Sequence, residues 1–333
     1  MALSDKILAA LEQSRGTPLS GQALAERFGV SRAAVWKGVN ALKSQGYAIA
    51  SATNRGYTLA AACDKLSAAG VRAFLPPALA GVPVFVYESV DSTNSEARRL
   101  RAGGQTGSFI VLAEQQTAGR GRRGRIFCSP AGGLYLSVAL ACEAGIAEAL
   151  PVTAYAAVSA VEAVREVCGV ETGIKWVNDL YKNGRKVGGI LTEAAADFES
   201  GTVTSLIVGV GLNLRAPEIA DFPPELAEIA GALGCGEEAV KNRLGAALAA
   251  RLLAYTPGST AHMAHYRAYS LVLGRAVAFE QGGQRFTGTA VRIGDDGALY
   301  VRTENGETAL RSGEISLRLE EPTGKETQNH EDQ

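Results

Sequence analysis

Four arginines and three glycines lie within seven consecutive residues of this chain, at Gly119–Arg125. Four guanidinium groups this close repel one another unless an anion lies among them. The glycines allow positive φ angles and a close approach of backbone N–H groups to a ligand. Segments 113–118 and 133–140 on either side predict strands, so the loop lies where sites are commonly built. The pattern predicts a loop that binds phosphate or carboxylate; a basic surface loop or nucleic-acid patch is the alternative.

The charge is unevenly distributed along the 333 residues, although the net charge is only −1. Residues 1–60 hold seven basic and three acidic side chains, which gives +4 and leaves −5 for the rest. A chain of this length, with 47% hydrophobic residues, is typical of a globular protein of two or three domains. The basic first module therefore indicates a nucleic-acid partner for that module alone.

The five cysteines are scattered without a CxxC pair, and the chain has only three histidines. Neither a zinc site nor a disulfide framework is expected from this pattern. The first residues lack a signal-peptide pattern, and no apolar run approaches about 18 residues. We therefore expect a cytoplasmic protein with no membrane partner.

The first 60 residues predict a winged helix-turn-helix domain. A helix over 4–14 precedes a second helix that Ser20 caps and Gly29 ends, and Ser31 caps a third. Two short strands, 47–50 and 56–59, then form a wing. On the third helix we expect an apolar side that consists of Val35, Trp36, Val39 and Leu42. The candidate DNA-binding residues are Ser31, Arg32, Lys37 and Arg55. A helical protein-interaction domain is the alternative.

A polar turn at Glu88–Asn94 follows a strand predicted over 83–87. Its last three residues, Ser92, Thr93 and Asn94, can cap the helix that follows. Three consecutive hydrogen-bonding side chains at a strand end can equally hold the polar end of a small ligand.

Asn183-Gly184 is a strong signal for a two-residue hairpin. With this turn, Tyr181 pairs with Lys186 and Asp179 pairs with Gly188. The period of two then places Asp179, Tyr181 and Lys186 on one face of the sheet. The lysine and aspartate form either a surface ion pair or an anion-binding lysine beside a metal-binding carboxylate.

The strand predicted over 206–214 carries Gly209, Gly211 and Asn213 on one face. Glycines weaken strands, so this strip allows either close packing of a helix or a flat floor for a ligand. Helices are predicted over 237–255 and 259–270, and short strands from residue 273 onward predict a small all-β barrel. The expected domains are 1–62, a linker over 63–82, a catalytic domain over 83–270, the barrel over 271–320 and a disordered tail over 321–333.

From about residue 4 to residue 320, these motifs together resemble the bifunctional biotin–protein ligases that also repress the biotin operon. The resemblance rests on five motifs in order, of which the glycine–arginine loop is the most specific. The others are Asp91–Asn94, Lys175–Asp179, Arg185–Leu191 and Gly209–Asn213. The chain departs from the family at Phe127, where tryptophan is frequent, and at Val177, where proline is frequent.

The resemblance implies an α+β multidomain fold. Its parts are an N-terminal winged helix-turn-helix, a central mixed sheet with flanking helices (class II synthetase-like) and a C-terminal SH3-like barrel. By position, the biotin-contacting residues are Ser92, Thr93, Asn94, Gln116, Arg120, Gly121, Arg122 and Lys186. Asn178, Asp179 and Asn213 match positions near ATP, with Asp179 near the magnesium ion. Arg120, Arg122 and Lys186 are the expected catalytic cations.

The implied reaction uses ATP, biotin and Mg²⁺. Biotin is activated to biotinyl-5′-AMP and then transferred to a lysine of a biotin carboxyl carrier protein. The implied partners are that acceptor, operator DNA and a second copy of the chain in a ligand-dependent homodimer. A lipoate–protein ligase and a biotin-sensing repressor without ligase activity are the alternatives.

Overall fold

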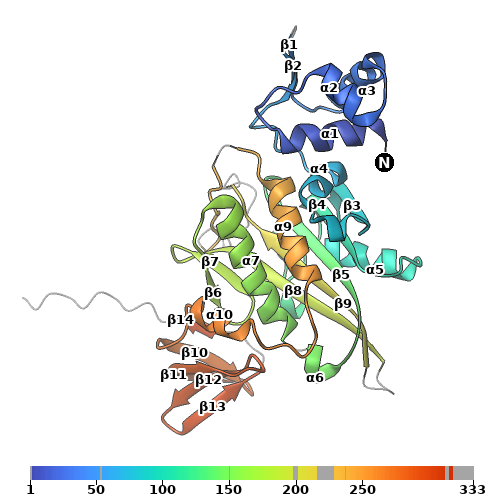
Figure 1. Cartoon of the computed structure of the whole chain (residues 1–333). Coiled ribbons are helices and arrows are strands. Elements are labelled where there is room, and N and C mark those ends of the chain that lie inside the picture. The colour runs from blue at the N-terminus through green and yellow to red at the C-terminus, as the bar shows by residue number, and fades with distance from the viewer. Residues whose placement is uncertain are drawn as a thin grey trace, which may run out of the picture.

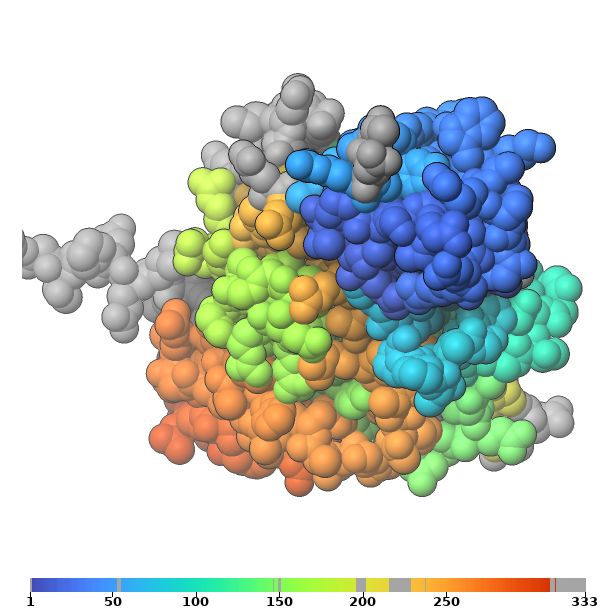
Figure 2. Space-filling view, turned by 45° about the horizontal axis from the view of Figure 1, so that its top comes forward, coloured from blue at the N-terminus to red at the C-terminus, as the bar shows by residue number. Residues whose placement is uncertain are grey.

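The three expected parts are present in the computed structural model, which describes residues 2–52, 55–149, 151–197, 202–215, 229–236, 238–311 and 315–317. A helical N-terminal domain, a central mixed sheet with helices and a small C-terminal antiparallel sheet follow one another along the chain (Figure 1). In the space-filling view the N-terminal domain (blue) and the C-terminal sheet (orange to red) lie at opposite sides of the central domain (Figure 2). The expected fold class is confirmed.

The N-terminal domain is a winged helix-turn-helix. Its elements are α1 (Leu3–Gln13), α2 (Gly21–Phe28), α3 (Arg32–Ser44), β1 (Ile49–Ala52) and β2 (Gly56–Leu59). The Ser20 and Ser31 hydroxyls accept hydrogen bonds from the N–H groups of Ala23 and Ala34, so both predicted caps are confirmed. Gly29 ends α2 at φ 64°, which a residue with a Cβ adopts at a cost. The expected wing tip at residues 53–54 lies outside the described residues.

A seven-stranded mixed sheet organises the central domain. Its strands are β3 (Val84–Val90), β4 (Phe109–Gln116), β5 (Leu134–Gly145), β6 (Gly173–Lys175), β7 (Asp179–Lys182), β8 (Arg185–Asp197) and β9 (Thr202–Leu212). The spatial order is β3-β4-β5-β9-β8-β7-β6. Only the β3–β4 pair is parallel, and the glycine–arginine loop connects the antiparallel pair β4 and β5.

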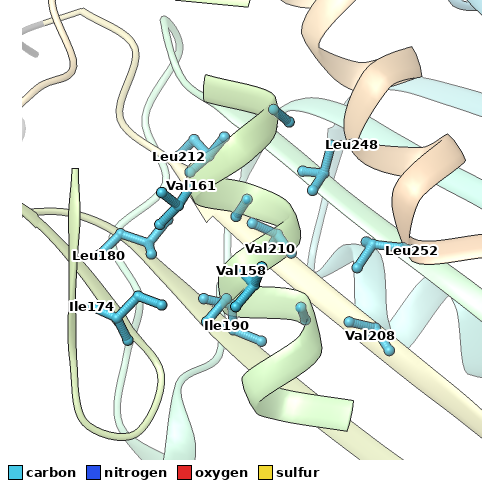
Figure 3. Close-up of a cluster of buried hydrophobic side chains, with 14 of the residues drawn as sticks. Val158, Val161, Ile174, Leu180, Ile190, Val208, Val210, Leu212, Leu248 and Leu252 are labelled. Carbon is cyan, nitrogen blue, oxygen red and sulfur yellow. The ribbon is translucent and has the colours of Figure 1, made fainter. Parts of the chain in front are cut away.

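Helices cover both faces of this sheet. On one face α7 (Val152–Cys168) and α9 (Lys241–Leu253) bury an aliphatic core against β5, β8 and β9 (Figure 3). On the other face α5 (Thr93–Ala102) packs Ala97 against Phe109 and Val111 of β4. Alternate residues of a strand point to opposite faces, which is why these apolar strands serve two cores. The remaining short helices are α6 (Ile146–Ala149) and α10 (Met263–Ala268), with single turns at Pro77–Leu79 and Arg122–Gly124.

The C-terminal strands form a five-stranded antiparallel sheet in the order β13-β12-β11-β10-β14. They are β10 (Ala276–Gln281), β11 (Gln284–Ile293), β12 (Leu299–Thr303), β13 (Gly306–Leu310) and β14 (Ile315–Leu317). Hydrogen bonds join this sheet to the central domain, among them Trp176 Nε1 to Gly297 O at 2.9 Å, Arg267 Nε to Ile293 O at 2.8 Å and Arg267 Nη2 to Asp295 Oδ1. The last residues of the expected barrel, 318–320, and the expected tail lie outside the described residues.

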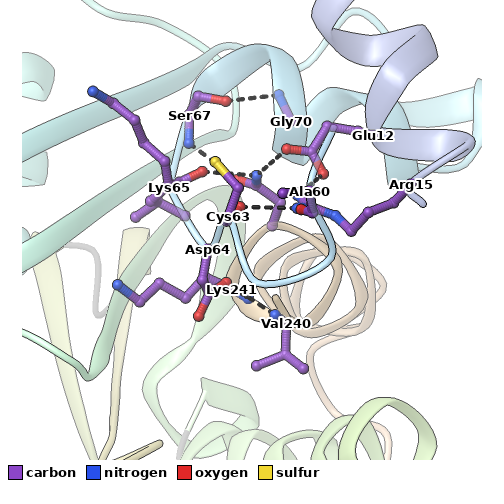
Figure 4. A network of polar contacts seen from close by, with 12 residues as sticks. Glu12, Arg15, Ala60, Cys63, Asp64, Lys65, Ser67, Gly70, Val240 and Lys241 are labelled. Atoms are coloured by element: carbon purple, nitrogen blue, oxygen red, sulfur yellow. Dashed lines mark hydrogen bonds and ion pairs between the residues drawn. The ribbon is translucent and has the colours of Figure 1, made fainter. Parts of the chain in front are cut away.

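The segment 63–82, which the sequence predicts as a linker, instead holds helix α4 (Ala68–Phe74). Helix α4 contacts α1, α9 and β3. A polar network fixes its start: Asn242 Nδ2 donates to Glu12 Oε1 at 2.9 Å and to Lys65 O at 3.0 Å, and Asn242 Oδ1 accepts from Ser67 N. Figure 4 shows Glu12, Lys65 and Ser67 close together in this network. The helix has only 7 residues, too few for a periodic pattern to indicate it, and its polar partner Asn242 is distant in the sequence.

Two acidic residues extend this network into the central domain. Asp64 Oδ1 accepts the N–H groups of Val240 and Lys241 at 2.9 Å each. The Lys241 ammonium pairs with Glu114 of β4. The N-terminal domain is thus joined to the strand that leads into the glycine–arginine loop.

Candidate active site

A cavity of about 280 Å³ lies between the glycine–arginine loop and the strands β7, β8 and β9. Every residue for which the sequence predicts biotin or ATP binding lines this cavity. They are Ser92, Thr93, Asn94, Gln116, Arg120, Gly121, Arg122, Asn178, Asp179, Lys186 and Asn213. The fold therefore brings five segments that are far apart in the sequence to one site.

The turn before α5 does more than cap the helix. Ser92 makes no side-chain cap bond. Instead Gln116 Oε1 accepts from the Thr93 N–H at 2.8 Å and from its hydroxyl at 3.2 Å, and Gln116 Nε2 donates to Ser129 Oγ at 2.8 Å. These bonds hold the end of β4 against the start of α5, where Ser92, Thr93 and Asn94 line the cavity.

Asn94 lies on the floor of the site, where it is only 3% exposed. Its Nδ2 donates to Glu193 Oε2 at 2.9 Å and its Oδ1 lies 2.7 Å from Ser137 Oγ. A Cβ on Gly209 would come within 2.2 Å of Asn94 Oδ1. At Gly209 the glycine strip therefore makes room for Asn94, which lies in the first turn of α5, so the strip serves both the packing of this helix and the site. Sequence reasoning missed Ser137 and Glu193; the one signal for Ser137 was a hydroxyl inside an apolar strand.

Replacing Gly209 with alanine should weaken biotin binding by about tenfold or more, because the added methyl group displaces Asn94 and an over-packed site costs about 1–3 kcal/mol. Titration calorimetry with biotin measures the effect. Gly81→Ala is the matched control, because a Cβ there meets no atom within 4 Å. Unchanged biotin affinity in Gly209→Ala would show that Asn94 plays no part in the pocket.

The hairpin turns at Asn183-Gly184, and Tyr181 pairs with Lys186 as predicted. The predicted pairing of Asp179 with Gly188 is wrong, because Asp179 pairs with Gly189. A β-bulge between these two pairs adds one residue to β8, which a turn signal cannot reveal. The bulge leaves Asp179, Tyr181 and Lys186 on the cavity face, as predicted.

Lys186 and Asp179 form an ion pair inside the site, with 2.6 Å between Nζ and Oδ1. Both side chains are three-quarters buried, so solvent screens the pair less than a surface pair. The Phe127 ring lies 5.9 Å from Lys186 Nζ and covers the Gly211 backbone, where a Cβ would come within 2.4 Å of the ring. Phe127 thus supplies an apolar surface beside the cations, as expected for a residue that packs against a flat ligand.

The loop itself is a short, closed turn. Gly121 N–H donates to Arg125 O at 2.7 Å, and Phe127 N–H donates to Gly119 O at 2.9 Å. Arg123 adopts φ 55°, which is unusual for a residue with a side chain. Arg122 Nη1 lies 3.4 Å from Asn178 Oδ1, and Asn178 Nδ2 donates to Ile190 O at 2.7 Å. The loop and the β6–β7 turn therefore meet over the cavity.

Asn213 closes the far end of the cavity and is 8% exposed. Its Nδ2 donates to Gly231 O at 3.0 Å and its N–H donates to Val187 O at 2.9 Å. These bonds hold the end of β9 against the bulge of β8. Among the described residues, no group of three or more His, Cys, Asp or Glu side chains gathers to hold a metal ion. A magnesium ion here would thus take ligands from Asp179 and from substrate phosphates, the usual arrangement for this ion.

The residues predicted to bind DNA are exposed on the N-terminal domain, and one part of the predicted apolar side of α3 is wrong. Val35, Val39 and Leu42 are buried, but Trp36 is 58% exposed and does not belong to the apolar side. Val35, Val39 and Leu42 recur at spacings of four and three and form the buried stripe of α3, and Trp36, about 100° further round the helix, lies outside it. Trp36 instead shares the outer side with Arg32, four residues earlier. Ser31 caps α3, and Arg55 is exposed next to the wing.

A winged helix-turn-helix joined to a mixed-sheet domain with an arginine-lined cavity defines a class of DNA-binding proteins that also bind a small anionic ligand. Family models match three stretches: the biotin/lipoate A/B protein ligase family over residues 86–213, a helix-turn-helix domain over 4–58 and the biotin protein ligase C-terminal domain over 272–318.

Relatives of the whole chain agree with these matches. The bifunctional ligase/repressor BirA of Bacillus subtilis is 32% identical over 90% of this chain and 94% of its own length. That of Escherichia coli K12 is 30% identical over 91% and 94%. The biotin protein ligase of Aquifex aeolicus, solved with biotin and ATP, superposes with a TM-score of 0.58 at 28% identity, covering 71% of this chain and 98% of that one. The chain belongs to the family of bifunctional biotin ligase/repressors.

Proposed function

We propose that this chain activates biotin with magnesium-ATP, transfers it to a lysine of a biotin carboxyl carrier protein and represses transcription as a ligand-dependent dimer. The observation that carries the proposal is the convergence of all five family motifs on one cavity that joins loop arginines to the Lys186–Asp179 pair. In the first step an oxygen of the biotin carboxylate attacks the α-phosphorus of ATP, the α–β phosphoanhydride bond breaks and pyrophosphate leaves. The product is biotinyl-5′-AMP.

The cations of the site account for this first step. Two anions must approach each other, and Arg120, Arg122 and Lys186 can stabilise the charge that develops between them. A bound magnesium ion, held by Asp179 and the phosphates, would add Lewis-acid stabilisation. Thr93, Asn94 and Gln116 would orient the uncharged end of biotin. Asn178 and Asn213 lie on the side where the nucleotide is expected.

In the second step the acceptor amine attacks the carbonyl carbon of the mixed anhydride, and AMP leaves with the electrons of the broken C–O bond. This route forms no covalent enzyme intermediate. The site agrees with it, because the three histidines include none among the cavity-lining residues and no Ser-His-Asp or Cys-His set lines it. Closure of the arginine loop over the adenylate would protect the anhydride from water.

The reaction is tested by incubating the purified protein with magnesium-ATP, a carrier protein and labelled biotin or lipoate. We expect biotin, and not lipoate, to appear on the carrier lysine, with one pyrophosphate released per transfer. Transfer of lipoate alone would make the protein a lipoate ligase. Tight biotin binding without pyrophosphate release would make it a sensor without ligase activity.

The repressor role is supported by the N-terminal domain. Arg32 and Trp36 lie on one side of α3, the second helix of the helix-turn-helix and therefore its recognition helix. Lys37 and Arg55 are exposed cations of the same domain that suit phosphate contacts. No helix among the described residues is long and apolar enough to cross a membrane. The protein would work in the cytoplasm, where its acceptor and operator are found.

A further inference from the structure

The Glu193 carboxylate lies where the floor of the site meets the glycine–arginine loop. Its Oε2 accepts the hydrogen bond from Asn94 Nδ2 at 2.9 Å. Its Oε1 lies 3.8 Å from Arg98 Nη1 and 4.0 Å from Arg120 Nη1. One side chain on β8 thus contacts both the start of α5 and the loop that covers the cavity.

The contact with Asn94 fixes the orientation of a buried amide. Because Oε2 of Glu193 accepts a hydrogen bond, the NH₂ group of Asn94 must face it, and Oδ1 must face Ser137. Without the carboxylate, Nδ2 keeps only the carbonyl of Leu191 at 3.2 Å. Ser137 also lies 2.7 Å from the Thr93 hydroxyl, so a turned Asn94 would disturb Thr93 as well.

The contact with Arg120 supplies charge to the loop. Each of the two ion pairs is long and half-exposed, so each alone contributes little. Together they place one negative charge between the guanidinium groups of Arg98 and Arg120. Arg120 lies at the start of the loop, close to the end of β4. The mutual repulsion of the loop arginines is largest when no anionic ligand is bound, and Glu193 offsets part of it in that state.

We propose that Glu193 is a positioning residue that sets the pocket before biotin binds: its hydrogen bond orients Asn94 and its charge holds the Arg120 end of the loop against the sheet. Glu193 need not touch the reacting atoms. The proposal rests on the proposed function, since it concerns the same pocket, and it assigns two separable tasks to one carboxylate.

Glu193→Ala and Glu193→Gln separate the two tasks. In Glu193→Ala the KM for biotin should rise about ten- to hundredfold, the range for losing a hydrogen bond to a charged group, while kcat and the KM for ATP stay within about threefold. Trypsin should also cleave the ligand-free protein after the loop arginines several times faster.

Glu193→Gln keeps an oxygen acceptor for Asn94, so its KM for biotin should stay within about fivefold of wild type. Its loop should nevertheless be cleaved as fast as in Glu193→Ala, because the charge is gone. Glu143→Gln, an exposed glutamate of β5, is the control and should match wild type in every measurement.

The proposal is overturned if Glu193→Ala binds biotin and resists trypsin as wild type does. It is also overturned if kcat and both KM values change together with the melting temperature, which would indicate a purely structural residue. Equal KM values for biotin in the Ala and Gln variants would remove the hydrogen-bonding task. If wild type fails to bind biotin, the proposed function fails, whereas the cleavage rates still test the charge on the loop.

Discussion

Lys186→Ala should slow biotinyl-5′-AMP formation by about two to three orders of magnitude, the effect of removing one preorganised charge donor from an active site. Lys186 lines the cavity and pairs with Asp179 at 2.6 Å, and both side chains are largely shielded from water. Removing the ammonium takes away positive charge where the carboxylate and the α-phosphate approach. It also leaves Asp179 as an uncompensated anion that repels both substrates.

Single-turnover release of pyrophosphate measures this step directly, without interference from transfer. Arg185→Ala is the matched control, because Arg185 is the neighbouring cation of the same hairpin, is exposed and is not among the cavity-lining residues. We expect its rate to stay within about twofold of wild type, as for most exposed substitutions. A Lys186→Ala protein that releases pyrophosphate at the wild-type rate would rule out the electrostatic role of Lys186.

Biotin together with ATP should raise the affinity for a palindromic operator by about 10- to 100-fold, within the usual range of ligand-linked coupling. One winged helix with a charge excess of +4 in residues 1–60 neutralises few phosphates, so a monomer should bind DNA weakly. A dimer presents two recognition helices to two half-sites. If biotinyl-5′-AMP favours the dimer, linkage requires that it strengthen dimerisation by the same differential affinity.

Sedimentation and operator-binding titrations, with and without biotin and ATP, test this expectation across salt concentrations. Lys37→Ala separates the DNA contact from the ligand response: operator affinity should fall and the salt slope should decrease by about one phosphate contact, while adenylate formation is unchanged. A protein that stays monomeric with adenylate bound would leave the ligase function intact and remove the ligand-dependent repressor.

The hydrogen-bond network around Asn242 connects the DNA-binding domain to the central sheet, and coupling between ligand binding and operator binding would pass through it. It links Glu12 of α1 to Asn242 at the start of α9, and the neighbouring Lys241 pairs with Glu114 of β4. Two residues along β4, Gln116 binds Thr93 in the site. Burial raises the pKa of the Glu12 carboxyl, although Arg15 at 2.5 Å opposes this. A rotation of the N-terminal domain relative to the catalytic sheet would therefore have to break these bonds.

The sequence by itself determined the features that depend on short spacings. Ser20, Gly29 and Ser31 set the helix-turn-helix because caps and left-handed turns are local. The Asn183-Gly184 turn set the face that Asp179 and Lys186 share, and the glycines of β9 indicated a strand that other parts of the chain approach closely. The five motifs in their order along the chain were enough to indicate the family. These features depend on residue types and on the spacing of residues that are close in the sequence, so the sequence alone predicts them.

Only the tertiary structure decided the rest, because it depends on contacts between segments that are distant in sequence. The bulge in β8 moved the partner of Asp179 by one residue, and the packing of a three-helix core placed Trp36 outside while Val35 went inside. Helix α4 has only 7 residues, too few for a periodic pattern, and its start is held by Asn242, which lies 175 residues after Ser67. Ser137 and Glu193 acquire their roles only where β5 and β8 meet the start of α5, since a lone polar residue in a strand becomes part of a site when folding supplies its partners.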